Sequence, residues 1–132
     1  MEDHRLLNSV ELVIRQPGDY KLVRMNLSRN YTNYVYLDPP YRPLSVTSSF
    51  REYSNSPFGD RQQEELKSFC DQIGRRGCCI MLSNSDSKNP DGSSYFDALY
   101  NGYRIVRVNA PRFINGNPHK RTNLNEVVIR NY

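Results

Sequence analysis

The chain of 132 residues contains no tryptophan and no run of about 18 apolar residues, the length that a membrane-spanning helix needs. Hydrophobic residues make up 37% of the sequence, and the mean hydropathy is -0.76, so no membrane span is expected. The segment after Met1 lacks the charged, apolar and small-residue zones of a signal peptide. Ten tyrosines and five phenylalanines exclude wholesale disorder, because disordered chains are poor in aromatic residues.

Cysteine and histidine are also scarce. The three cysteines, Cys70, Cys78 and Cys79, are odd in number and two are adjacent, which suits neither a disulfide framework nor a Cys-x-x-Cys metal site. His4 and His119 have no partners at the spacing of a metal site or a catalytic triad. The composition therefore predicts a reducing, cytoplasmic location and no metal.

The charge is unevenly distributed along what its length predicts to be a single domain, residues 1–132. The first 100 residues hold 12 Lys or Arg and 13 Asp or Glu, whereas the remaining 32 hold six and one. The net charge is thus -1 before residue 101 and +5 after it. A basic segment favours a polyanionic partner, nucleic acid first, and the alternative is a solvated basic loop.

Short apolar, β-branched runs predict strands at residues 10–14, 34–37, 78–82, 103–109 and 126–132, the last two as a pair. A helix is predicted from a capping box of Asp60 with Gln63 and from one apolar face, made by Leu66, Phe69, Cys70 and Ile73. A second, short helix is expected to begin at Ser94, with Asp97 as its box partner. Strands alternating with helices indicate an α/β fold.

Polar side chains follow several of the predicted strands. Asp19, Asp38 with Tyr41, and Asn84 with Asp86 each come just after an apolar run. Because ligands of open α/β sheets bind outside the carboxyl ends of the strands, these groups are candidates for one site. The alternative for Asp19 and Asp86 is a turn-forming role, and Asn84 and Asp86 are either structural or at the edge of a pocket.

Asp38-Pro39-Pro40-Tyr41 looks like the DPPY motif of amino-group methyltransferases that use S-adenosylmethionine. With the segments at 36–45, 47–50, 82–86, 112–117 and 126–132, in that order, it resembles the carboxyl-terminal half of Dam-type (D12 class) adenine-specific DNA methyltransferases. The resemblance covers about residues 10–132. It implies a partial Rossmann-like methyltransferase fold, with a mixed sheet that ends in a carboxyl-terminal antiparallel hairpin.

The resemblance also implies roles for individual residues. The Asp38 carboxylate and the Pro39 carbonyl would accept hydrogen bonds from the exocyclic amine of adenine in double-stranded DNA. Tyr41 would stack on the base after it is flipped from the duplex. Asp19 and Tyr20 are similar to the pair that contacts the cofactor adenine, and Asp38 would also meet the ammonium group of S-adenosylmethionine.

Two further segments are expected to meet DNA. The Ser, Thr, Pro and Asn-rich stretch at 42–59 is read as a loop that acts as a lid over the flipped base, with Phe50 and Tyr53 as contacts. The alternative is a surface loop anchored by its aromatic residues. The basic connection between the last two strands would lie against phosphates through Arg112, Asn115, Asn117, Lys120 and Arg121.

The chain departs from the family pattern in its glycines. The family has a Phe-x-Gly-x-Gly cofactor loop after its first strand, but the seven glycines of this chain are never two residues apart. There is also no room before Asp19 for the target-recognition region. The sequence therefore predicts the catalytic half of a methyltransferase, with an apolar sheet edge or face left open and an upstream complementary fragment as a candidate partner.

Alternative functions remain open from sequence. An RNA adenine or cytosine N4 acceptor would keep the cofactor and change the substrate. An inactive DNA-binding remnant would use only the basic carboxyl-terminal segment. The sequence does not distinguish restriction-modification from repair or regulation, and it gives no oligomeric state.

Overall fold

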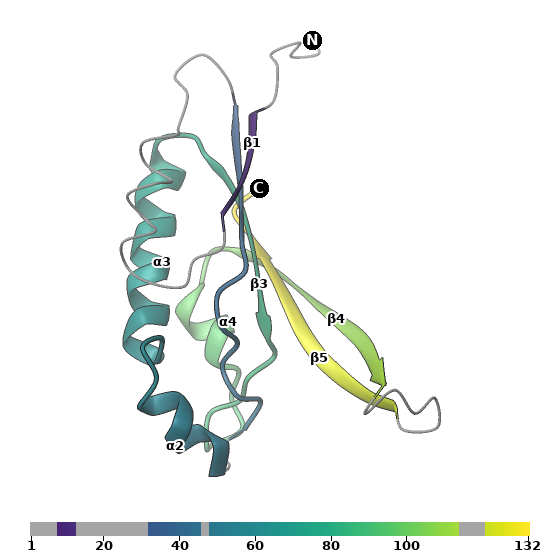
Figure 1. Cartoon of the computed structure of the whole chain (residues 1–132). Coiled ribbons are helices and arrows are strands. Elements are labelled where there is room, and N and C mark those ends of the chain that lie inside the picture. Colours follow the sequence, from purple (N-terminus) through teal and green to yellow (C-terminus); the bar gives the residue numbers. More distant parts are fainter. Residues whose placement is uncertain (1–7, 13–31, 46–47, 114–120) are drawn as a thin grey trace.

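Three short parallel strands form one part of a five-stranded sheet, and a long antiparallel hairpin forms the other (Figure 1). The computed structural model describes residues 8–12, 32–45, 48–113 and 121–132. The parallel strands are β1 (Asn8–Leu12), β2 (Asn33–Leu37) and β3 (Cys79–Ser85), and the hairpin consists of β4 (Arg104–Phe113) and β5 (Arg121–Arg130). β5 also pairs antiparallel with β3, so the order is β1-β2-β3-β5-β4. The predicted mixed α/β sheet with a carboxyl-terminal antiparallel hairpin is confirmed.

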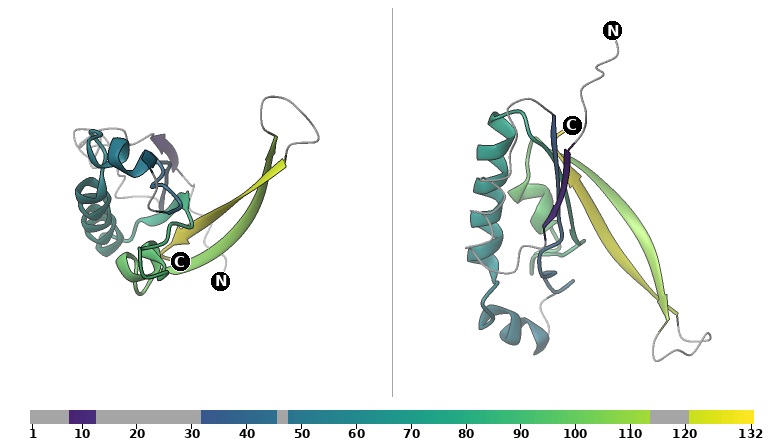
Figure 2. Two further views of the ribbon diagram at one scale, coloured as in Figure 1. Left: turned by 90° about the horizontal axis from the view of Figure 1, so that it is seen from below. Right: turned by 45° about the horizontal axis from the view of Figure 1, so that its top comes forward.

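All the described helices lie on one side of this sheet (Figure 2). They are α2 (Ser48–Ser54), α3 (Asp60–Arg75) and α4 (Tyr95–Leu99). Within the described ranges, no helix covers the opposite face, and none is long and apolar enough to cross a membrane. The β4–β5 hairpin extends beyond the other strands, away from the helices.

The core forms where α3 and α4 pack on the sheet. Alternate residues of three neighbouring strands are buried on the helix side: Val35 and Leu37, Ile80 and Leu82, Val127 and Ile129. They meet the apolar face of α3, made by Leu66, Phe69, Cys70 and Ile73 as its periodicity predicted. The two-residue period of the strands and the 3.6-residue period of the helix thus account for the packed layer between α3 and the sheet.

The opposite face of the sheet stays open in the described part of the chain. Tyr36 on β2 is 38% exposed, and Val106 and Val108 on β4 are 50% and 41% exposed. Parallel strands in soluble proteins are normally covered on both faces. The open apolar face expected from the sequence is therefore present.

The helix boundaries correct two sequence predictions. α3 begins after Gly59, whose backbone N–H donates to Gln62 Oε1 over 2.8 Å, so the expected box of Asp60 with Gln63 is wrong by one residue. Ser94 does precede α4, but its side chain makes no capping hydrogen bond. Asp97 instead accepts two 2.8 Å hydrogen bonds from Arg107.

The predicted loops are shorter than expected. Helix α2 lies within the stretch at 42–59 that was expected to be loop. β3 continues through the polar residues Ser83, Asn84 and Ser85 because they pair with the apolar strand β5. β4 and β5 extend to Phe113 and from Arg121, so the basic connection is partly a paired hairpin. Pairing with β5 set the boundaries of β3 and β4.

Candidate active site

The Asp38–Tyr41 segment leaves the sheet at the carboxyl end of β2, beside the carboxyl end of β3. β2 and β3 are paired in parallel up to Leu37 and Leu82. Asp38 is exposed, Pro39 is buried and Tyr41 is half-buried. Two prolines in succession end the ladder, because neither has an N–H to donate. The carboxylate thus faces solvent at the sheet edge where α/β proteins bind ligands.

The backbone that follows Pro39 is held by polar groups from α3 and from the end of β3. Gln63 Nε2 donates to the Pro40 carbonyl over 3.0 Å, and the Arg42 N–H donates to Asn84 Oδ1 over 3.0 Å. The remaining bonds run from 85–88 to 42–44: Ser85 Oγ to the Arg42 carbonyl, Ser87 Oγ to the Pro43 carbonyl, and the Lys88 N–H to the Leu44 carbonyl over 2.9 Å. The backbone is therefore held at Pro40, Arg42, Pro43 and Leu44, on either side of Tyr41.

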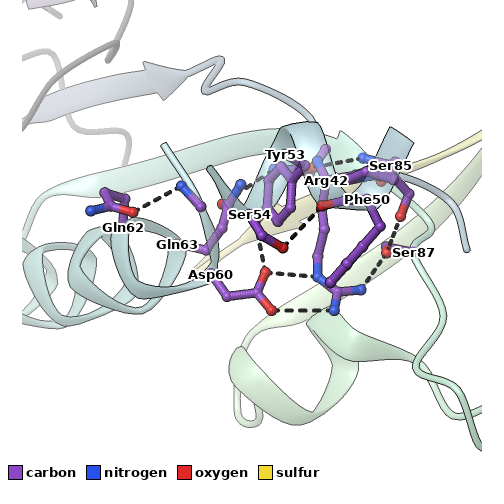
Figure 3. A network of polar contacts seen from close by, with 12 residues as sticks. Arg42, Phe50, Tyr53, Ser54, Asp60, Gln62, Gln63, Ser85 and Ser87 are labelled. Atoms are coloured by element: carbon purple, nitrogen blue, oxygen red, sulfur yellow. Dashed lines mark hydrogen bonds and ion pairs between the residues drawn. The ribbon is translucent and has the colours of Figure 1, made fainter. Parts of the chain in front are cut away.

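Arg42 contributes its side chain as well as its backbone (Figure 3). Only 4% of the residue is exposed. Its Nε and Nη2 donate to the two carboxylate oxygens of Asp60 over 2.9 and 3.3 Å, and its Nη1 donates to Ser87 Oγ over 2.7 Å. The guanidinium carbon also lies 4.0 Å from the centre of the Tyr95 ring. A buried cation is stable here because a carboxylate, a hydroxyl and a ring face surround it.

Tyr41 lies next to the exposed carboxylate of its own motif. Burial first, and then the charges of Glu126 and Asp38, raise the pKa of Tyr41 to about 12, and a hydrogen bond with Ser83 acts in the opposite direction. The phenol therefore stays neutral at physiological pH. A neutral, half-exposed ring suits stacking on an apolar or aromatic partner.

The stability contribution of this phenol depends on pH. Because the folded pKa of Tyr41 is raised from 10.0 to about 12, the folded state keeps a proton that the unfolded state has lost. The contribution is complete below pH 10 and is lost as the pH rises towards 12. We expect Tyr41→Phe to reduce the loss of unfolding free energy across this interval, measured by urea denaturation. Identical pH slopes for the two proteins would contradict the assigned environment.

Asn84 and Asp86, at the end of β3, are fully engaged in protein contacts. Asn84 is 0% exposed, and its Oδ1 accepts from the N–H groups of Arg42 and Ser85. Asp86 is 8% exposed and forms ion pairs of 3.1 Å with Lys88 and Arg107. Of the two interpretations left open by the sequence, these contacts favour the structural one.

The aromatic residues predicted to meet DNA differ in position. Phe50, on α2, is half-buried, and its ring centre lies 5.3 Å from the Arg42 guanidinium carbon. Tyr53 is 8% exposed and its hydroxyl donates to Asp60 Oδ1 over 2.7 Å. Tyr53 therefore offers little surface to a ligand in this structure, and its DNA contact stays a prediction.

The remaining predicted residues lie at the edge of the described structure or outside it. Arg112 is in β4, where its backbone pairs with Thr122, and Arg121 is in β5, where its backbone pairs with Phe113. Asp19, Tyr20, Asn115, Asn117 and Lys120 lie outside the described residues. The structure thus places Asp38, Pro39 and Tyr41 in one segment, while Phe50 and Tyr53 contact the neighbouring Arg42–Asp60 pair.

Sequence reasoning missed the supporting residues Gln63, Arg42 and Ser87. Gln63 carried a signal, since it lies three residues before Leu66 on the apolar face of α3, where a polar side chain needs a partner. Its amide meets the Pro40 carbonyl. Arg42 and Ser87 gave no comparable signal, because a basic residue and a serine in loops are normally solvated.

The described residues fit only one end of an S-adenosylmethionine molecule. The exposed Asp38 carboxylate can accept from an ammonium group, but no Gly-x-Gly loop exists in the sequence to approach the rest of the cofactor. Among the described residues, no group of three or more His, Cys, Asp or Glu could hold a metal ion.

The sequence of the chain is similar to those of known DNA methyltransferases. The chain is 38% identical over 129 residues to the type II methyltransferase M.MjaIII of Methanocaldococcus jannaschii, covering 97% of this chain and 41% of that protein. It is 34% identical over 95 residues to a DNA adenine methylase of Haemophilus influenzae, covering 71% and 31%. The DNA N-6-adenine-methyltransferase of Escherichia phage P1 is 36% identical over 80 residues, covering 61% and 10%.

The chain thus spans about two fifths or less of the length of these relatives. A family model described as D12 class N6 adenine-specific DNA methyltransferase matches residues 15–114, which include the Asp38–Tyr41 segment, α2, α3 and β3. The chain belongs to the D12 class N6 adenine-specific DNA methyltransferase family.

Proposed function

We propose that this chain is the catalytic half of an enzyme that transfers a methyl group from S-adenosylmethionine to adenine N6 in double-stranded DNA. The observation that carries the proposal is the exposed Asp38 carboxylate, held at the carboxyl end of β2 by a segment whose backbone is fixed from residue 40 to residue 44. Family membership supports the choice of acceptor.

The proposed chemistry follows from the acceptor. The exocyclic amine of adenine is a poor nucleophile because its lone pair is delocalised into the ring. Hydrogen bonds from its two protons to the Asp38 carboxylate and the Pro39 carbonyl draw the nitrogen towards a geometry that can attack. Methyl transfer to this nitrogen would release one of its protons to solvent, while the Asp38 carboxylate and the Pro39 carbonyl hold the amine in place. The contribution of the protein is positioning and electrostatic stabilisation.

Tyr41 serves the flipped base in this proposal. Removing a base from the duplex costs a few kcal/mol of stacking and pairing. A ring held beside Asp38 offsets part of that cost by stacking. The neutral phenol and the fixed backbone on either side of Tyr41 support this role.

A further region must complete the cofactor site. S-adenosylmethionine supplies the methyl group, and in this proposal Asp38 meets its ammonium group while Asp19 and Tyr20 meet its adenine. A glycine-rich loop and a target-recognition region would come from a complementary polypeptide region. Three facts support this: no Gly-x-Gly in the sequence, the 41% coverage of M.MjaIII, and the open face around Tyr36, Val106 and Val108.

The first experiment is transfer of labelled methyl to unmethylated duplex DNA by the purified chain, alone and mixed with the part of M.MjaIII that it does not match. N6-methyladenine in the digested product is the expected result. Methyl on cytosine N4, or transfer only to RNA, would replace the acceptor. If neither the chain alone nor the mixture transfers methyl but the chain still binds DNA, an inactive DNA-binding remnant would be favoured. The missing glycine loop supports that candidate.

DNA affinity is expected to come from the outer end of the β4–β5 hairpin. Arg107, nearer the helices, is neutralised by Asp86 and Asp97, so phosphate contacts are assigned to Arg112, Lys120 and Arg121. Changing these three residues to glutamine should weaken DNA binding. It should also make the plot of log affinity against log salt less steep, reducing the magnitude of its slope by roughly two to three. Fluorescence anisotropy of labelled duplex DNA over a salt series measures both.

The matched control changes three exposed arginines of α3 and its carboxyl end, Arg61, Arg75 and Arg76, to glutamine. It removes the same net charge. An equal change of slope in the two triple variants would show that net charge, and not the hairpin, governs binding.

The cytoplasm is the proposed location. The three free thiols of Cys70, Cys78 and Cys79 support a reducing compartment.

A further inference from the structure

Arg42 follows Tyr41 directly, where a basic residue would be expected to reach out towards phosphate. Instead it points inward, as Figure 3 shows, and is 4% exposed. Its contacts come from four separate segments: Asp60 at the start of α3, Ser87 after β3, Tyr95 at the start of α4 and Phe50 on α2. One side chain thus joins the three described helices to the segment that carries Asp38.

Asp60 extends these contacts to a second aromatic residue. Its Oδ1 accepts from Arg42 Nε over 2.9 Å and from the Tyr53 hydroxyl over 2.7 Å. Both Phe50 and Tyr53 of α2 therefore meet the Arg42–Asp60 pair, one through its ring and one through its hydroxyl. The carboxylate lies in the first turn of α3, where the helix dipole favours negative charge.

The backbone of Arg42 is held at the same time. Its N–H donates to Asn84 Oδ1 and its carbonyl accepts from Ser85 Oγ. The backbone at Tyr41 is therefore tied to Asn84 through the next residue, and Arg42 cannot leave without breaking the ion pair with Asp60. The backbone position of the Asp38–Tyr41 segment is consequently coupled to the position of α2.

We propose that Arg42 is a positioning residue that makes the Asp38–Tyr41 segment and the aromatic helix α2 move as one unit. The role of that unit in holding a flipped adenine rests on the proposed function. The coupling itself does not, since it follows from the contacts of Arg42 within the chain. Only arginine supplies it, because the bidentate contact to Asp60 and the third donor to Ser87 need a planar fork of N–H groups.

Amide hydrogen exchange of the purified full chain tests the coupling. In Arg42→Met we expect exchange to speed up roughly ten-fold or more at position 42 and across 50–56, since a buried charged pair is broken. The Ile80 amide, which donates to Asn131 Oδ1 at the other end of β3, is the internal reference and should not change. Arg42→Lys should fall between Arg42→Met and the unchanged protein.

Arg61→Met is the matched control, because Arg61 lies next to Asp60 and its side chain is 84% exposed. It should leave exchange at all these amides unchanged. Unchanged exchange at 50–56 in Arg42→Met would overturn the proposal. So would uniform acceleration that includes Ile80 in both Arg42→Met and Arg42→Lys, which would make Arg42 a general stabilising residue.

Methyl transfer by the completed enzyme, meaning this chain together with the complementary region, distinguishes a failure of this inference from a failure of the proposed function. If it transfers methyl, Arg42→Lys should lower kcat about ten-fold or more and leave KM for DNA within about two-fold, because binding by the hairpin is untouched. A rise in KM with kcat unchanged would overturn the positioning role. Absence of transfer by the unchanged enzyme would count against the proposed function, and the exchange experiment would still decide the coupling.

Discussion

Replacing Asp38 with alanine is expected to lower methyl transfer by the completed enzyme by about 10²–10³-fold, with the fold intact. The carboxylate is exposed, and among the described residues no hydrogen bond or ion pair involves it, so its removal leaves nothing buried without a partner. The amine would lose its charged acceptor at the moment when positive charge develops on the nitrogen, which is the kind of interaction worth roughly 10²–10³-fold per group. Initial rates with labelled S-adenosylmethionine measure the effect.

Two variants test this interpretation. Asp38→Asn keeps the size and one acceptor and should recover only a small part of the rate. Asp91→Ala removes another exposed carboxylate, in the turn before α4, and should transfer methyl at the original rate. Circular dichroism of all three should match the unchanged protein. A fully active Asp38→Ala enzyme would remove Asp38 from the mechanism.

The largest effect on stability is expected at Phe69. This side chain lies on α3 facing the sheet and is 2% exposed. Phe69→Ala should lower the free energy of unfolding by about 3–5 kcal/mol, the range for a buried phenylalanine that leaves a cavity. The free energy of unfolding of a whole domain is only about 5–15 kcal/mol, so the variant should be partly unfolded at 37 °C. Urea denaturation followed by circular dichroism gives the difference.

Ser68→Ala is the matched control, because Ser68 is the preceding, exposed residue of the same helix. It should change the stability by no more than about 0.5 kcal/mol. Phe69→Leu, which keeps most of the volume, should fall between the two. A loss below about 1 kcal/mol in Phe69→Ala would mean that α3 does not pack on the sheet as described.

The sequence predicted the elements whose own residues determine them. The strand that contains Val35 and Leu37 and the stripe that contains Leu66 and Phe69 follow from local periodicity, and both were found. The position of Asp38 at the end of that strand followed from the two prolines after it. These features need no information from a distant part of the chain.

The elements that were missed depend on partners far along the chain. Ser83–Ser85 is polar and resembles a loop, but it is a strand because β5 pairs with it. Helix α2 was expected to be loop, and its aromatic residues contact Arg42 and Asp60. Gln63 was assigned to a cap because it follows Asp60 by three residues, whereas its amide meets the Pro40 carbonyl. Local propensity cannot show such contacts.

The position of β5 within the sheet also has a consequence for folding. β3 pairs with β5 across a separation of 41 to 49 residues, and the Asp86 N–H donates to the Asn125 carbonyl just beyond that pairing. The groups that hold residues 42–44 belong to 84–88, the segment that this pairing aligns. The catalytic segment therefore depends on this non-local pairing, and a chain without β5 in place would lack both Val127 and Ile129 of the core and the alignment of the site.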